Sequence, residues 1–433
     1  MTLHLLLVGG EDHSLRMPFM TALRSIGHKI TVAASGDPDP FLRAGFAFQP
    51  FQFNRFCGPR SDFRARRVLA KMLRDVDADV AHCFDTKLGL LVPFAASANP
   101  RTAIVRTING RGWIFSSRSP PALALRAAYL PLQRLASFFT DATVFEHSGD
   151  QSFFERYRLL GASRPVMIPG AGIDIEGFEL AGRSGPSPQD LRRELGLVGA
   201  EVVTTVTRVT RQKGIPALLR AADLVHRVRP SVRFLVVGPR ESEGPFGVSD
   251  REMQQRSPYV LATGPRADVP SILAMSDMFA FPSEYAEGVP RALMEAALCS
   301  LPIVTTNLPG CREVVRDGWN GVVTPLRDPR SLADAIVDML SNRTKAMTMA
   351  ARGPDVIRRK FSLANVVDRH AELYESLVGE RNITRTSQPP SSDKEALADA
   401  SVLWRQMPEG VAAGRPANGG REGGLARNGR RSS

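Results

Sequence analysis

Two carboxylates, Glu287 and Glu295, stand eight positions apart in the stretch "EYAEGVPRALMEAALCSLPIVTT". Pro290 is favoured as the first residue of a helix, so we expect Glu287 in the loop before that helix and Glu295 about one and a half turns inside it. Backbone N–H groups at a helix N-terminus stabilise an anion, and Gly288 beside Val289 lets a phosphate approach closely. Carboxylates accept hydrogen bonds from the hydroxyls of a sugar or a ribose. The stretch therefore predicts a site for a nucleotide diphospho-sugar.

A pair of cations follows the first predicted strand of the second half of the chain. In "TRVTRQKG", four residues separate Arg208 from Lys213, and Gly214 follows. Two positive charges at the carboxyl end of a strand can neutralise a diphosphate leaving group. Arg211 could take part, but at its place in the loop it could equally be solvated. We therefore predict that Arg208 and Lys213 bind the diphosphate.

Several other residues have a structural explanation beside a functional one. Gly9 and Gly10 end the first predicted strand, and their spacing is not that of a dinucleotide-binding glycine pattern. His147, in "VFEHSGD", could contact substrate or be a buried structural histidine. His82 and Cys83 would need further ligands nearby to hold a metal ion, and the sequence offers none, so we predict no metal site. The cysteines lack paired or metal-type spacing and are expected to be reduced thiols: Cys57, Cys83, Cys299 and Cys311.

Short β-rich runs alternate with helical stretches in both halves of the chain. Such runs are "LHLLLVGG", "KITVAAS" and "ADVAHCFD" in the first half, and "EVVTTVTRV", "RFLVVG" and "MFAFPS" in the second. Strands that alternate with helices form a parallel sheet covered by helices on both faces. We predict an α/β fold of two doubly wound, Rossmann-like units joined by a Gly/Pro/Ser-rich linker near 171–188. Substrates should bind in the cleft between the units, beyond the carboxyl ends of the strands.

The net charge of +12 is concentrated in two stretches of the first half. Residues 55–74 hold seven basic side chains and one acid, and residues 101–140 hold six arginines and no acid. Such segments lie on an anionic membrane surface or form solvated helix faces. No nucleic-acid-binding module is visible, and neither a secretory signal nor a transmembrane stretch is predicted. The polar, Gly-rich residues 381–433 are expected to be disordered.

The order and spacing of these motifs resemble the retaining glycosyltransferases of family 4, which have two facing Rossmann-like domains (the GT-B fold). The resemblance runs from Leu3 to about Val378. Glu287 and Glu295 match the family's E-x7-E motif, and "RVTRQKG" matches its R-x4-K-G pair. "MIPGAGIDIEGF" looks like the interdomain segment, and "TGPRADVPSILAMSDMFAFPS" and "LPGCREVVRDGWNGVVTP" look like two further family stretches.

The resemblance implies a donor site and a mechanism. Arg208 and Lys213 would bind the donor diphosphate, Glu287 the transferred sugar and Glu295 the ribose. The amides near Gly288 and Val289 would bind the distal phosphate, and Gly9 and Gly10 would lie close to the donor phosphates and the acceptor. Catalysis would rest on Glu287, Arg208 and Lys213. In this family the basic pair and the helix dipole take the place of a metal, so neither a metal nor another cofactor is expected. Retention would come from departure and attack on one face, without a covalent intermediate.

The acceptor is implied to bind the first domain. Several family members carry a histidine in the loop that here reads "RTINGRGW", where Asn109 and Gly110 stand instead, so we expect only a polar contact from Asn109. The N-terminal segments resemble bacterial enzymes that extend lipid-diphosphate-linked saccharides for exopolysaccharide, capsule or O-antigen. The implied partners are a nucleotide sugar (a UDP-sugar), a lipid-linked saccharide acceptor and an anionic membrane surface. The implied location is the inner face of the cytoplasmic membrane.

We predict an acceptor-binding domain over residues 1–172, a nucleotide-sugar-binding domain over 173–355, a helix over 356–380 that returns to the first domain, and a basic tail over 381–433. Two other functions remain open. A GT-B nucleotide-sugar epimerase would turn over its donor without an acceptor. A non-catalytic sugar-nucleotide-binding protein would bind the donor without consuming it.

Overall fold

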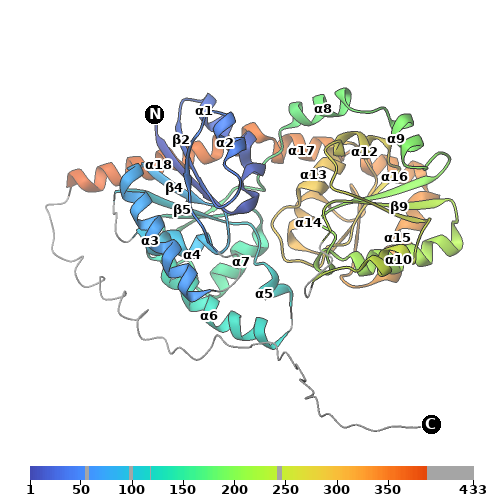
Figure 1. Ribbon diagram of the computed structural model, residues 1–433, viewed down its shortest axis with the longest axis horizontal. Helices are drawn as coiled ribbons and strands as arrows, with labels where there is room; N and C mark the ends of the chain where they lie inside the picture. Colours follow the sequence, from blue (N-terminus) through green and yellow to red (C-terminus); the bar gives the residue numbers. More distant parts are fainter. Residues whose placement is uncertain (54–57, 97–100, 118, 241–245, 388–433) are drawn as a thin grey trace, which may run out of the picture. The chain divides into compact units, whose positions relative to one another are not determined.

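The structure, a computed structural model, describes residues 1–53, 58–96, 101–117, 119–240 and 246–387 of the chain. Within these residues the strands form two parallel sheets with helices on both faces (Figure 1). The first sheet has seven strands in the order β3-β2-β1-β4-β5-β6-β7. Their bounds are β1 His4–Gly9, β2 Lys29–Ala34, β3 Ala47–Pro50, β4 Val80–Cys83, β5 Ala103–Ile108, β6 Ala142–Phe145 and β7 Arg164–Met167.

Alternate side chains of β1 point to opposite faces of the first sheet, as in any strand. Leu5 and Leu7 pack with the apolar side chains of α1, whereas Leu6 and Val8 pack with those of α3 and α4. Both faces are therefore buried, which explains why β1 reads as a continuous apolar run. The helices of this half are η1 Glu11–Arg16, α1 Met17–Ser25, α2 Asp39–Arg43, α3 Pro59–Val76, α4 Leu88–Ala96, α5 Trp113–Ser116, α6 Pro120–Ser137 and α7 Ser148–Arg156.

The second sheet has six strands in the order β10-β9-β8-β11-β12-β13. Their bounds are β8 Glu201–Val206, β9 Val232–Val237, β10 Val260–Gly264, β11 Met278–Phe281, β12 Ile303–Thr306 and β13 Val322–Thr324. Val203 faces a core formed with α10 and α15, and Val202 faces one formed with α9 and α12. The helices of this half are α8 Ile175–Ser184, α9 Pro188–Glu194, η2 Arg211–Lys213, α10 Ile215–Val228, α11 Asp250–Gln254, α12 Val269–Met275, α13 Arg291–Leu298, α14 Pro309–Val314, α15 Pro329–Ser341 and α16 Arg343–Ala350.

The strand order reverses beside the first strand of each sheet. β1 lies between β2 and β4, and β8 lies between β9 and β11. In such sheets the ligand binds at this switch point, beyond the carboxyl ends of the strands. Gly9 and Gly10 stand at the end of β1, and the segment from Arg208 to Lys213 follows β8, so the topology places both predicted motifs where substrates should bind.

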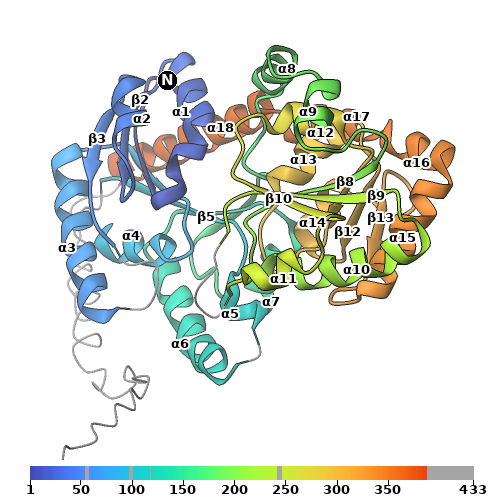
Figure 2. The same ribbon diagram turned by 45° about the vertical axis from the view of Figure 1, so that its right-hand side comes forward.

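The last helices connect the two halves. α17 (Gly353–Phe361) packs on α13 of the second half, and α18 (Leu363–Ser387) lies beside the first sheet in both views (Figure 2). Tyr374 of α18 is buried in the core around β1, and its hydroxyl lies 2.6 Å from Nδ1 of His82 on β4. The predicted pair of Rossmann-like units with a returning C-terminal helix is therefore present.

Two local expectations differ from the structure. The Gly/Pro/Ser-rich linker contains helix α8, which begins where the Asp174 side chain accepts the Gly177 N–H, and α9 begins at the linker's last residue, where the Ser187 side chain accepts the Asp190 N–H. α18 continues to Ser387, so the first residues of the predicted tail are helical, and the rest of that prediction lies outside the described residues. None of the described helices is both long enough and apolar enough to span a bilayer.

Candidate active site

The loop after β11 brings the predicted acid and the predicted cation together. Glu287 forms an ion pair with Lys213 through Oε2 and accepts the Ser283 hydroxyl through Oε1 at 2.6 Å. Ser283 is fully buried, and only 16% of the Glu287 side chain and 12% of the Lys213 side chain is exposed. Gly214, with φ of +74°, lets η2 lie against β11, because a Cβ there would be 1.8 Å from the Pro282 carbonyl oxygen. The Lys213–Glu287 pair therefore lies where the segment after β8 packs against the segment after β11.

Backbone groups from the first half hold this same loop. The Gly112 N–H donates to the Ala286 carbonyl at 3.1 Å, and Gly110 pairs with Glu287 as an antiparallel β-bridge. Gly110 has φ of +105°, and a Cβ on it would lie 2.5 Å from the Ala286 carbonyl oxygen. The glycine at this position is thus needed for close approach to the loop, whereas the sequence indicated only a weak acceptor contact.

The two amides predicted to bind phosphate already have acceptors in the first half. The Gly288 N–H donates to the Asn109 carbonyl at 2.9 Å, and the Val289 N–H donates to Oε2 of Glu146 at 3.1 Å. A phosphate could reach these two N–H groups only if both exchanged partners. Asn109 therefore contributes its backbone to the site's framework, and Glu146 is a residue that sequence reasoning missed.

Glu295 lies inside α13, as expected from its spacing. Its side chain accepts from Nε of Arg291 at 2.8 Å, and only 11% of it is exposed. Burial raises the pKa of Glu295, with Arg291 acting in the opposite direction. Any ribose hydroxyl that binds Glu295 must share this carboxylate with the half-exposed Arg291.

The second predicted cation has a different setting. Arg208 is half-buried just after the end of β8, and its carbonyl accepts the Thr210 N–H at 2.9 Å. Arg211 pairs with Glu252 of α11 at 2.8 Å. The structure thus separates Arg211 from the Lys213–Glu287 pair, in line with its reading as a surface residue.

Residues 1–380 form one compact unit, and a cavity of about 310 Å³ lies between its two Rossmann-like halves. Its walls include Gly9, Gly10, Asp85 and Asn109 from the first half and Val289 and Arg291 from the second. Lys213, Glu287 and Glu295 are not among its lining residues, so the predicted site divides into a cavity and an adjoining ion-paired cluster.

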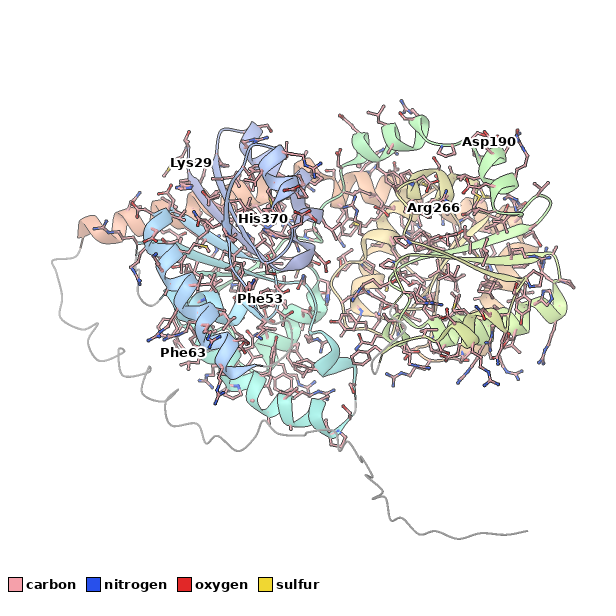
Figure 3. All side chains as sticks on the ribbon, in the orientation of Figure 1. Lys29, Phe53, Phe63, Asp190, Arg266 and His370 are labelled. Atoms are coloured by element: carbon pink, nitrogen blue, oxygen red, sulfur yellow. The ribbon has the colours of Figure 1, made fainter. Side chains whose placement is uncertain are left out.

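The glycine loop has no room for a side chain at Gly9 and little room for one at Gly10. A Cβ on Gly9 would lie 1.9 Å from Nδ1 of His13, and one on Gly10 would lie 3.2 Å from Oδ2 of Asp85. The ring of Phe53, labelled in Figure 3, would lie 3.4 Å from the same Cβ on Gly10. An aromatic ring beside a carboxylate suits the apolar face and hydroxyls of a sugar. The sequence held no local signal for Asp85 or Phe53, because only the fold places them next to Gly10.

Arg16 is another lining residue that the sequence did not single out. Its guanidinium lies over the ring of Phe84, 4.3 Å from the centroid, and burial lowers its pKa. Nearby Glu146 and Asp85 act in the opposite direction on that pKa. The cavity therefore contains an arginine from each half, Arg16 and Arg291.

His147 has a structural role. It caps α7, since its Nδ1 accepts the Asp150 N–H at 3.2 Å, and only 2% of its side chain is exposed. Burial lowers the pKa of His147, but Asp150 and Glu146 outweigh this and raise it overall. Arg111 binds the same Asp150 at 2.8 Å. These contacts favour the structural reading of His147 over substrate contact.

The two basic stretches differ in the structure. On α3 the acid-poor outer face is exposed, with Phe63 among its side chains (Figure 3). Its exposed basic residues recur at helical spacing: Arg60, Arg64, Arg67, Lys71 and Arg74. The buried face holds Ala65, Leu69 and Met72.

In the second stretch several arginines serve the fold instead. Arg106 is fully buried on β5, where it donates to Thr143 and Gln133, and burial lowers its pKa to about 10. Arg126 donates to the Ile114 and Ser117 carbonyls. Arg111 is ion-paired as described, and Arg118 lies outside the described residues. Arg101 and Arg134 are exposed, so only part of this stretch can form a basic surface.

The described residues contain no group of three or more His, Cys, Asp or Glu side chains placed to hold a metal ion. Cys83, Cys299 and Cys311 are free thiols, and Cys57 lies outside the described residues. Burial raises the pKa of each of the three thiols to about 12, so they are poor nucleophiles at neutral pH.

Comparison with known proteins gives two family matches. Residues 19–176 match the glycosyltransferase family 4 model, and residues 200–342 match the model described as glycosyl transferases group 1. Each match falls on one of the two Rossmann-like units, and together the two matches cover more than half of the chain.

Curated relatives include bacterial enzymes of known name. The chain is 26% identical over 321 residues to the Escherichia coli UDP-Gal:α-D-GlcNAc-diphosphoundecaprenol α-1,3-galactosyltransferase, covering 73% of this chain and 80% of the relative. It is 22% identical over 378 residues to the Campylobacter jejuni N,N'-diacetylbacillosaminyl-diphospho-undecaprenol α-1,3-N-acetylgalactosaminyltransferase, covering 86% of this chain and 97% of the relative.

Solved structures agree on the fold. Anabaena HepE in complex with UDP matches with a TM-score of 0.70 at 20% identity, covering 86% of this chain and all of that one (100%). Sucrose-phosphate synthase from Thermosynechococcus elongatus matches with a TM-score of 0.72 at 17% identity, covering 87% of this chain and 100% of that one. With each unit matched in sequence and the whole arrangement matched in structure, the chain belongs to the family 4, group 1 glycosyltransferases and has the GT-B fold.

Proposed function

We propose that the protein is a retaining glycosyltransferase that moves a hexose from a UDP-sugar to a lipid-diphosphate-linked saccharide in exopolysaccharide, capsule or O-antigen synthesis. The observation that carries this proposal is the Lys213–Glu287 pair beside a cavity built from both halves. Two relatives named for diphospho-undecaprenol acceptors, and a fold relative that binds UDP, support the choice of substrates. Both enzyme names specify an α linkage in the product, and retention of the configuration of an α-linked nucleotide sugar gives that linkage.

The proposed roles begin with an exchange of partners. When the donor binds, Lys213 turns from Glu287 to the diphosphate, and Glu287 becomes able to accept a hydroxyl of the transferred sugar. Arg208 adds a second positive charge for the leaving diphosphate. With two cations from the chain neutralising the leaving group, the reaction needs no divalent metal and no other cofactor.

The acceptor enters the cavity from the side of the first half. Asp85 can accept a hydroxyl of the acceptor sugar, while the Phe53 ring covers its apolar face. The exposed basic face of α3 holds the protein on an anionic membrane at the inner face of the cytoplasmic membrane, where a lipid-linked acceptor is found.

The test is a mass-spectrometric screen of UDP-hexoses against undecaprenyl-diphosphate monosaccharides. We expect UDP release only when an acceptor is present, together with a lipid product that is one hexose heavier and has an α linkage by NMR. A β linkage would rule out retention. Conversion of the nucleotide sugar without acceptor would identify an epimerase, and donor binding with no turnover by any pair would point to a non-catalytic protein.

A further inference from the structure

Glu146 is a buried carboxylate to which the proposed mechanism assigns no role. It follows β6 directly, only 4% of it is exposed, and burial raises its pKa. Arg16 and the Val289 N–H act against that rise by stabilising the carboxylate. Keeping a carboxylate away from water is costly, so a residue kept there should serve a purpose that an apolar side chain could not.

That purpose is visible in its contacts with the loop that carries Glu287. Oε2 of Glu146 accepts the Val289 N–H at 3.1 Å, across 143 positions of sequence. A carboxylate is a stronger acceptor for an N–H than a neutral oxygen. The contact therefore fixes the backbone two residues after Glu287.

The neighbouring glycine is shaped to this contact. A Cβ on Gly288 would lie 2.0 Å from Oε2 of Glu146 and 3.2 Å from the carbonyl carbon of Asn109. On the opposite side, a Cβ on Gly310 would lie 1.8 Å from the Gly288 carbonyl oxygen. The loop 286–289 is thus enclosed between Glu146 and the segment 109–112 on one side and α14 on the other.

Glu146 acts on the site through this loop. It does not line the 310 Å³ cavity, whereas Val289, to which it is bonded, does. The backbone bonds of residues 109–112 hold the front of the loop, and Glu146 holds its end. With both ends fixed, the Glu287 side chain has its place opposite Lys213 and Ser283.

We propose that Glu146 is a positioning residue of the transfer reaction: by binding the Val289 N–H from the other half of the molecule, it sets the orientation of Glu287. The second half does not orient this carboxylate alone. The donor-sugar site is complete only when the two halves are engaged. The inference rests on the proposed function where turnover is measured.

The experiment compares three variants of the full chain. Glu146→Ala removes the acceptor, Glu146→Gln keeps a carbonyl oxygen in its place, and Asp141→Ala is the control. Asp141 precedes the same strand and also accepts a backbone N–H, that of Ile104 at 2.7 Å. Glu146→Ala should lower kcat by on the order of 100-fold, as a small misplacement of a reacting group does, with little change in KM for the donor. Glu146→Gln should recover most of kcat, and Asp141→Ala should leave it unchanged.

Amide hydrogen exchange gives a readout that does not depend on turnover. A peptide covering residues 286–294 should exchange faster in Glu146→Ala than in the wild type, and at the wild-type rate in Asp141→Ala. If Glu146→Ala does not fold, Gly288→Ala takes its place, because its methyl group displaces the loop from the Glu146 carboxylate and should give the same losses.

Three results would each overturn the positioning role. They are a folded Glu146→Ala with normal kcat, unchanged exchange of the loop, and a Glu146→Gln variant as slow as Glu146→Ala. A wild-type protein with no turnover on any donor and acceptor would refute the proposed function instead, and the exchange experiment would still decide the role of Glu146.

Discussion

At the scale of single residues, the proposed mechanism requires Lys213 to exchange its ion pair with Glu287 for the diphosphate of the donor. Replacing Lys213 or Arg208 by Ala should lower turnover by two orders of magnitude or more, because each removal takes away a charge that stabilises the departing diphosphate. Steady-state rates of UDP release measure this. Arg211→Ala is the matched control, since Arg211 lies in the same loop but pairs with Glu252. Near-normal rates in both active-site variants would exclude the two cations from the mechanism.

The same two residues determine the expected response to metal removal. If the chain's own cations neutralise the leaving group, as proposed, activity should survive EDTA, and added Mg²⁺ or Mn²⁺ should change it little. The rate of product formation with and without chelator tests this in one experiment. Complete loss with EDTA and recovery with either ion would show that a metal performs the task assigned here to Lys213 and Arg208.

At the scale of elements, α18 places ionisable groups in the core of the first half. His370 lies 5.5 Å from the ring of His82, and His13 is buried nearby against Phe84. Burial lowers the pKa of His370 to about 4 and that of His13 to about 3, and that of His82 well below 6.5. The unfolded chain therefore binds more protons between these values and about 6.5. Stability contributed by the neutral histidines is fully present above pH 6.5 and is lost as the pH falls.

Thermal unfolding followed between pH 7.5 and pH 5 should therefore show a falling Tm. Each such histidine contributes up to about 1.4 kcal/mol per pH unit to the slope. His370→Leu should flatten this dependence, because one of the proton-binding groups of the unfolded chain is gone. A variant with an unchanged pH slope would mean that His370 does not contribute to the acid lability. Protonation of buried Glu146 and Glu295 has the opposite sign, which is why the comparison with the variant is needed.

The elements also show what could be predicted from the sequence. The strands of both sheets follow from apolar runs, and the Lys213–Glu287 meeting follows from two motifs that end neighbouring strands, β8 and β11. Glu146 could not be found this way, because its partner is 143 positions away and no local period marks it. Arg106 was counted in a predicted basic surface for a related reason. Composition includes its charge, but only the fold shows that β5 directs its side chain into the core.

At the scale of the whole molecule, the net charge of +12 matters through where it is exposed. The outer face of α3 offers five exposed basic side chains with Phe63 and Val68, each of these two 45% exposed. Each basic group near an anionic surface is worth about 1 kcal/mol, so a few acting together would hold the protein on a bilayer. The attachment should weaken with salt, since the Debye length falls from about 10 Å at 0.1 M to about 3 Å at 1 M.

We therefore expect the full chain to sediment with vesicles containing anionic lipid at low salt and to be partly released at high salt. Replacing Arg64, Arg66, Arg67 and Lys71 together by Gln should weaken sedimentation and leave donor affinity intact.

A control with the same loss of charge replaces exposed arginines of the second half: Arg220, Arg227, Arg312 and Arg330. If net charge alone governs binding, both quadruple variants will lose it equally. If the α3 face is the contact, only the first quadruple variant will lose binding. In that case Phe63→Ser should remove the part of the binding that resists salt, because that aromatic ring would insert at the interface. A wild-type protein that stays in the supernatant at low salt would refute the membrane contact and favour a soluble acceptor.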